Sequence, residues 1–114
     1  MPFLRIQTSA AVAEQTGQAL LKKASRVTAE ALGKPEQYMM VCLEAGRPLI
    51  FGGGTEPAAF VELKSIGLPA RNTAALSAML CSLIESDLGV SKSRVYINFS
   101  DVPGHLWGWN GATF

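Results

Sequence analysis

Two similar helix endings divide this chain into halves. Leu32-Gly33 and Leu88-Gly89 each close a stretch with helical periodicity, and each is followed by a short polar turn and a β-favouring run, Tyr38 onward and Val95 onward. A repeat of about 55 residues is long enough for one βαβ unit, so this echo predicts two βαβ halves. The 114 residues have room for both halves within one compact domain, residues 1–114.

The first half predicts a strand, a helix and a second strand. Pro2 to Gln7 has the mixed alternation of a strand, and 13–32 has the period of an amphipathic helix. Gly33 ends this helix, and Pro35 prevents it from restarting at once. The apolar run 38–43 predicts the second strand. The apolar face of the helix consists of Leu20, Leu21, Ala24, Val27 and Ala31.

The second half repeats this order after a loop. Glycines and prolines across 44–57 predict the loop, and 58–66 predicts the third strand. A helix from 72 or 73 to 88 follows and ends at Gly89, and 94–100 predicts the fourth strand. The apolar stripe of this helix consists of Leu76, Met79, Leu80, Leu83, Ile84 and Leu88.

These elements predict an α/β fold of the α+β type. Two βαβ repeats would form one four-stranded mixed sheet, with two antiparallel helices on one face. No helix remains to cover the other face. Its strands carry apolar residues at both parities, so we expect that face to meet other subunits of an oligomer.

The composition excludes several classes of protein. The net charge is +1 and no basic cluster occurs, so we expect no nucleic-acid partner. No apolar run approaches the roughly 18 residues of a membrane helix, and the N-terminus lacks the pattern of a secretory leader. We therefore expect a cytoplasmic protein with no membrane partner. Cys42 and Cys81 lie in apolar contexts without a CxxC pattern, which favours free thiols.

Seven short motifs occur in an order and spacing that match a known family. They are Pro2-Phe3-Leu4, Gly33-Lys34-Pro35-x-Gln37-Tyr38, Phe51-Gly52-Gly53, Glu56-Pro57, Ser65-Ile66-Gly67, Arg94-Val95-Tyr96-Ile97-Asn98 and Gly108-Trp109-Asn110. Over its whole length the chain resembles the macrophage migration inhibitory factor and D-dopachrome tautomerase family. The resemblance implies a homotrimer with a barrel-like core and active sites at subunit boundaries. It also implies keto–enol tautomerase activity toward arylpyruvates such as phenylpyruvate, with no metal or organic cofactor.

Pro2 is the candidate catalytic base. Proton transfer beside a ketone needs a base whose pKa lies near the working pH, and α-amino groups titrate at about 7.7–8.0 before any perturbation. From position alone, Pro2 could simply begin an edge strand, where proline is tolerated. The resemblance favours a catalytic amine, exposed once Met1 is removed. While Met1 remains attached, the Pro2 nitrogen is an amide and cannot act as a base.

The resemblance also implies a set of substrate-binding residues. Lys34 would pair with the substrate carboxylate or keto oxygen, although on its own it is a cation near a helix C-terminus. The Ile66 backbone N–H, next to Ser65, would donate to a substrate oxygen. Two residues of the fourth strand and three other aromatics would surround the aromatic ring of a small 2-oxo acid. They are Tyr96, Asn98, Tyr38, Trp109 and Phe114.

Some positions depart from the family pattern, and two rival hypotheses stay open. The chain has no cysteine across 58–61, where animal members carry a CxxC motif, and Lys64 and Trp107 would alter the pocket rim. The first rival is a cytokine-like binding or signalling protein, for which a protein receptor is left open. The second is another reaction of the same amine, which would need arginines such as Arg5, Arg47, Arg71 or Arg94 near Pro2.

Overall fold

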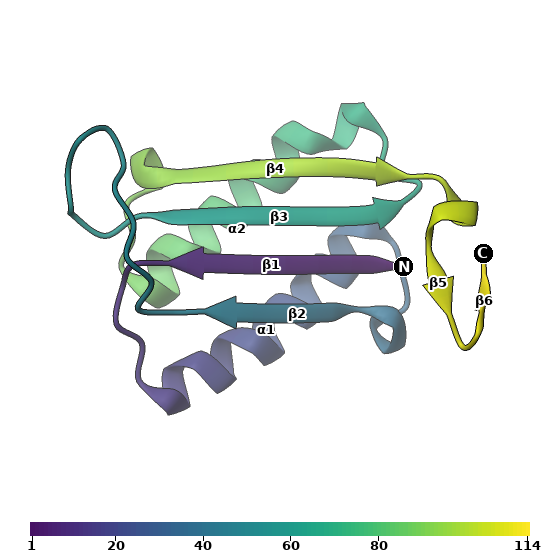
Figure 1. The fold of residues 1–114 in the computed structure, drawn as a ribbon, viewed down its shortest axis with the longest axis horizontal. Coiled ribbons are helices and arrows are strands. Elements are labelled where there is room, and N and C mark those ends of the chain that lie inside the picture. Colours follow the sequence, from purple (N-terminus) through teal and green to yellow (C-terminus); the bar gives the residue numbers. More distant parts are fainter.

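The computed structural model describes all of residues 1–114 and shows one four-stranded sheet covered by helices on one face (Figure 1). The chain ends in a small separate hairpin beyond the sheet. The principal elements are β1 (Pro2–Thr8), α1 (Glu14–Leu32), β2 (Met40–Glu44), β3 (Ala59–Ile66), α2 (Thr73–Leu88), β4 (Val95–Val102), β5 (Gly108–Trp109) and β6 (Ala112–Thr113).

The sheet has the order β2-β1-β3-β4, which confirms the predicted arrangement of two βαβ units. β1 pairs parallel with β2, and β3 pairs parallel with β4. The two units meet where β1 pairs antiparallel with β3, from Pro2 opposite Ser65 to Thr8 opposite Ala59. Both helices lie behind the sheet and run in opposite directions (Figure 1).

The two glycines that the sequence marks as helix ends adopt the left-handed conformation that such ends require. Gly33 has φ +66° and Gly89 has φ +70°, a region that residues with a Cβ rarely adopt. The Gly33 N–H donates to the carbonyl of Glu30 at 3.1 Å, and the next N–H, of Lys34, donates to Ala29 at 3.0 Å. These bonds satisfy carbonyls that the helix leaves free and turn the chain back toward the sheet.

The core lies between the helices and the covered face of the sheet. Alternate residues of the central strands point into it, and Leu4, Ile6, Val61 and Leu63 are fully buried. The buried stripe of α1 differs from the predicted apolar face. Leu20 and Ala24 are buried as predicted, but Leu21 and Val27 are only partly buried, Ala31 is exposed, and the helix also buries Gly17, Thr28 and Ala29. A prediction based on apolar residues overlooks Gly17 and the polar Thr28. At Gly17 the chain packs closely, because a Cβ there would lie 3.4 Å from the Leu43 side chain.

The other face of the sheet carries an ion-pair network with apolar side chains at each end. The Arg5 guanidinium lies 3.0 Å from Glu62 and 3.5 Å from Glu44, one carboxylate on each neighbouring strand. Met40 and Tyr96 lie near opposite ends and are 64% and 65% exposed. This open face is therefore mixed rather than uniformly apolar.

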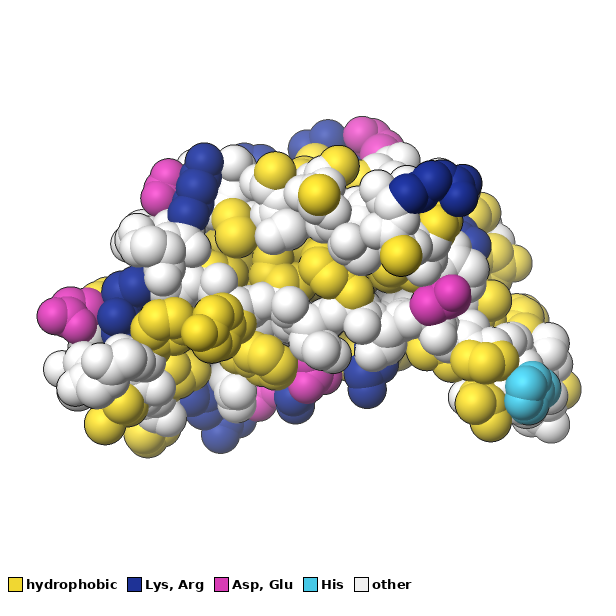
Figure 2. Space-filling view, turned by 90° about the horizontal axis from the view of Figure 1, so that it is seen from above, with side chains coloured by type: hydrophobic (Ala, Val, Ile, Leu, Met, Phe, Trp, Pro, Cys, Tyr) yellow, Lys and Arg dark blue, Asp and Glu magenta, His cyan; other side chains and the backbone are white.

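Three details differ from the expectation. β2 begins at Met40 rather than at 38, because Glu36–Tyr38 form a 3₁₀ turn. β4 extends to Val102, and the tail folds into the hairpin β5–β6. Figure 2 shows this tail, marked by the single histidine, projecting from one end of the body.

No helix has the length and apolar character to span a bilayer.

Leu80 on α2 provides a test of the core. Leu80 is fully buried, so Leu80→Ala should lower the free energy of unfolding by about 2–5 kcal/mol through lost burial and a residual cavity. Urea denaturation would measure the change. The same substitution at Leu106, which is 68% exposed, is the matched control and should cost much less. Equal losses at both positions would contradict this description of the core.

Candidate functional site

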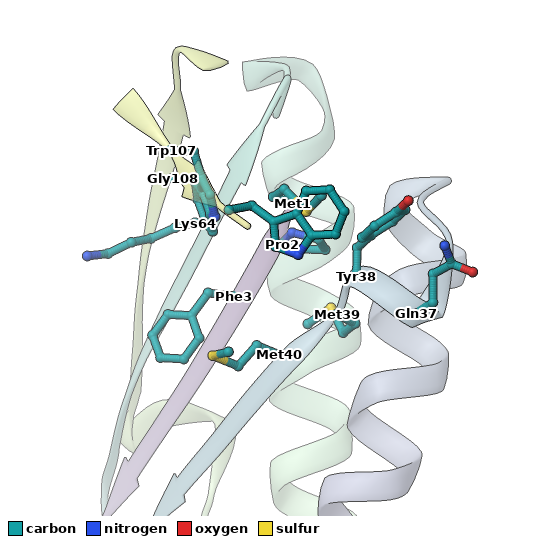
Figure 3. Close-up of a pocket in the computed structure, with 11 residues that line it drawn as sticks. Met1, Pro2, Phe3, Gln37, Tyr38, Met39, Met40, Lys64, Trp107 and Gly108 are labelled. Atoms are coloured by element: carbon teal, nitrogen blue, oxygen red, sulfur yellow. The ribbon is translucent and has the colours of Figure 1, made fainter. Parts of the chain in front are cut away.

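A cavity of about 480 Å³ opens at the end of the sheet where the chain begins (Figure 3). Its walls come from the start of β1, the 3₁₀ turn before β2, the end of β3 and the tail. Most of the lining is hydrophobic. The lining residues are Met1, Pro2, Phe3, Gln37, Tyr38, Met39, Met40, Lys64, Trp107, Gly108 and Trp109.

Pro2 is held rigidly in this wall. It is less than 2% exposed and lies opposite Ser65, which is also buried. Strand alternation directs Pro2 and Ser65 to the helix side of the sheet, whereas the next pair, Phe3 and Lys64, belongs to the open face. The Ser65 hydroxyl donates to the carbonyl of Ile66 at 3.2 Å, at the end of β3. Three predicted site residues therefore meet at one end of the sheet.

The electrostatic environment favours a neutral amine at the start of the chain. The pKa of the Met1 amino group lies below its ordinary value of 8.0, first because burial disfavours the cation and second because of the positive charge of Lys34. Lys34 does not line the cavity wall. Its Nζ lies beside the turn after β3, where a Cβ on Gly67 would be 3.6 Å away.

Tyr38 and the tail form an aromatic wall. The Tyr38 and Trp109 rings meet edge to face with centroids 6.0 Å apart, and Phe114 stacks on Trp109 at 5.8 Å. The Phe114 N–H donates to the carbonyl of Trp107 at 3.2 Å, which closes the tail hairpin. Tyr38 and Trp109 line the cavity, whereas Phe114 supports Trp109 from its other side.

Tyr96 and Asn98 lie elsewhere in this chain. In the sheet register, the position on β4 nearest Pro2 is Asp101, across Ser65. Tyr96 is five residues further along, roughly 17 Å at strand spacing, and Asn98 is roughly 10 Å along. Tyr96 instead lines a second hollow of about 360 Å³ with Phe51 and other apolar residues. Within one chain, neither residue shares the cavity of Pro2.

Arg94 fixes the loop beside Tyr96. Its guanidinium donates to four carbonyls, those of Pro57 at 3.1 Å, Phe51 at 3.2 Å, Glu56 at 3.1 Å and Gly54 at 3.3 Å. It also lies 5.0 Å from the centre of the Phe51 ring, which packs against Tyr96 with centroids 4.7 Å apart. Tyr96 therefore has a preset position before any ligand binds.

Several cavity residues are not among those that the sequence identifies as site residues. Lys64 and Trp107, expected at the rim, both line the cavity. Phe3 and Met40 are neighbours across β1 and β2 on the open face, so strand alternation and register together could have indicated them. Met39 and Gln37 belong to the turn before β2, for which the sequence offers no comparable signal. No cluster of three or more metal-ligating side chains is present.

These features define an α+β protein of two βαβ units whose second residue is a buried proline at an apolar cavity. The sequence model described as macrophage migration inhibitory factor (MIF) matches residues 1–114. The chain is 39% identical to a macrophage migration inhibitory factor homolog of Brugia malayi over 116 aligned positions, covering 100% of this chain and 99% of the relative. This protein belongs to the macrophage migration inhibitory factor family.

Solved structures of relatives agree with this assignment. The homologue from Prochlorococcus marinus is 46% identical with a TM-score of 0.94, covering 98% of both chains. The protein from Trichinella spiralis is 34% identical with a TM-score of 0.92, covering 98% of this chain and 99% of its own. Sequence identity and structural similarity to these relatives therefore both extend over 98% of the chain.

Arg94→Met should loosen the loop at 51–57. The substitution removes donors from four carbonyls but keeps much of the apolar stem, so the loop amides should exchange with deuterium faster. Hydrogen exchange followed by mass spectrometry would measure this, because the Phe51 and Gly54 amides bond across the loop at 3.1 and 3.0 Å. Arg71→Met, at an exposed arginine outside this network, is the control. Unchanged hydrogen exchange in the Arg94 variant would show that the bonds from Arg94 do not hold the loop at 51–57.

Proposed function

We propose that this protein is a keto–enol tautomerase acting on arylpyruvates such as phenylpyruvate, with the Pro2 amine as general acid and base after removal of Met1. The observation that carries the proposal is the burial of Pro2 at an apolar cavity, where the pKa of the adjoining Met1 amino group is lowered first by burial and second by the positive charge of Lys34. An apolar cavity accepts an aromatic ring, and a neutral amine near pH 7 can remove a proton. Membership of the family supports the same activity.

In the proposed mechanism, each residue has a separate task. Lys34 attracts the carboxylate or keto oxygen of the substrate, and the Ile66 N–H, beside Ser65, donates to the developing oxyanion. Tyr38 and Trp109 form the wall for the aromatic ring, and Phe114 supports this wall by stacking on Trp109. In the keto-to-enol direction the Pro2 amine removes a proton from the carbon beside the carbonyl and the carbonyl oxygen gains one to form the enol; in ketonisation the amine takes the enol proton and delivers a proton to that carbon. The mechanism needs no metal or organic cofactor.

The proposal includes a homotrimer, because Tyr96 and Asn98 cannot reach the Pro2 cavity of their own chain. A second copy that packs against the open face would bring these residues to the cavity from outside. Exposed apolar side chains on that face and its adjoining loop, including Ile50 at 69%, favour such burial. Each site would then lie at a boundary between subunits. The oligomeric state can be measured by analytical ultracentrifugation.

Pro2→Ala tests the catalytic assignment. It replaces the rigid secondary amine, so the rate of phenylenolpyruvate ketonisation should fall by a factor on the order of 10² or more. Absorbance of the enol follows the reaction. Pro48→Ala makes the same change at an exposed loop position and should retain activity. In the parent protein, activity should rise in proportion to the fraction of molecules that lack Met1, as measured by intact mass spectrometry. A Pro2→Ala variant that ketonises phenylenolpyruvate at the parent rate would contradict the proposed role of Pro2.

The pH dependence tests the role of Lys34. A base acts when neutral, so kcat/KM should rise with pH through the pKa of the Pro2 amine and then level off. Burial and Lys34 lower the pKa of the amine at the start of this chain, so we expect this limb below the ordinary α-amino value. Lys34→Met removes the positive charge and should move the limb to higher pH. Lys22→Met, at an exposed lysine of α1, is the control. An unmoved limb in Lys34→Met would contradict this role.

A further inference from the structure

Lys64 is a free cation on the wall of the Pro2 cavity. It is the only charged side chain among the lining residues, and it makes no hydrogen bond or ion pair within the chain. The acid nearest to it along β3, Glu62, is already held by Arg5 at 3.0 Å. Asp101 accepts from the Leu68 N–H at 3.0 Å, so it too has a partner. The ammonium group of Lys64 therefore has no partner within the chain.

The position of Lys64 separates it from Lys34. Lys64 pairs with Phe3 on the open face of the sheet, whereas Lys34 follows α1, behind the sheet, and approaches the turn at Gly67. Figure 3 shows the Lys64 side chain extending away from Pro2, with its ammonium group at the edge of the site. In the single chain Lys64 is exposed, as long cationic side chains at an apolar surface commonly are. The two lysines thus flank the start of the chain from two sides.

We propose that Lys64 is a specificity-determining residue that selects arylpyruvates carrying a second anionic group on the aromatic ring. This inference rests on the proposed tautomerase site. An arylpyruvate with only its own carboxylate satisfies one of the two lysines and leaves the other unpaired. A ring-carboxylated arylpyruvate brings a second anionic group to the cavity wall on which Lys64 lies.

The test compares phenylpyruvate with 4-carboxyphenylpyruvate. In the parent protein the second acid should have the higher kcat/KM, through a lower KM. Lys64→Met keeps the apolar stem and removes the charge, so the ratio of the two kcat/KM values should fall roughly fivefold, the scale of an exposed ion pair. Lys64→Arg should restore the ratio. Lys22→Met, which lowers the net charge equally at an exposed lysine of α1 behind the sheet, should leave the ratio at the parent value.

Salt gives a second readout that a purely structural role would not move. The preference of the parent protein should shrink as NaCl rises from low to physiological levels and beyond, because exposed charges are screened. The ratio for Lys64→Met should not respond to salt. An unchanged ratio in Lys64→Met, or an equal loss in kcat/KM for both acids, would overturn the proposal.

Binding separates this proposal from the proposed reaction. Calorimetric titration of the Pro2→Ala variant, whose ketonisation should be slower by a factor on the order of 10² or more, measures affinity with little turnover. A Lys64-dependent preference for the dianion in binding would uphold the specificity role even if neither acid is ketonised. Turnover of phenylpyruvate without any such preference would instead uphold the reaction and refute the role of Lys64.

Discussion

The antiparallel pairing of β1 with β3 is the interaction on which the rest of the structure depends. It joins two βαβ units that each pair only in parallel within themselves, and it makes one sheet of four strands. The same register brings Pro2 opposite Ser65 and Phe3 opposite Lys64. A slip of one residue would send Leu4 and Ile6 to the open face and turn Pro2 away from the helices. The core and the site are therefore fixed by one set of backbone hydrogen bonds.

Much of this fold follows from sequence pattern, and the reasons are local. The helices end where Gly33 and Gly89 adopt positive φ, which few other residues tolerate, so their boundaries could be predicted closely. The hairpin β5–β6 could not be predicted, because strands of two residues have no measurable alternation. Its position depends on contacts of Trp109 with Tyr38 and Phe114 that join distant parts of the sequence.

The candidate site was predictable to a different degree in each part. Motif order identified Pro2, Ser65 and Ile66 together, and the register places them at one end of the sheet. It also identified Tyr96 and Asn98, but a motif does not say whether two residues act in the same chain. Spacing along β4 shows only that neither residue lies at the Pro2 cavity of its own chain, which is why the proposed site needs a second copy. Residues such as Met39 had no sequence signal, since their role depends on how the turn before β2 docks.

The chemistry of the site depends on where a sheet can bury an amine. A lysine at the position of Pro2 would place a long, strongly basic side chain in an apolar wall. Because the ordinary pKa of lysine is high, at about 10.4, burial would have to lower it by several units before the amine became neutral near pH 7. An α-amino group has a pKa near neutrality, so burial first and a nearby cation second need to lower that pKa only modestly to favour the neutral form. Proline adds a ring that fixes the direction of the nitrogen lone pair. The beginning of a central strand, buried beneath two helices and next to a cavity at its end, meets these requirements together, so under the proposed mechanism the loss of Met1 would convert a structural proline into a base.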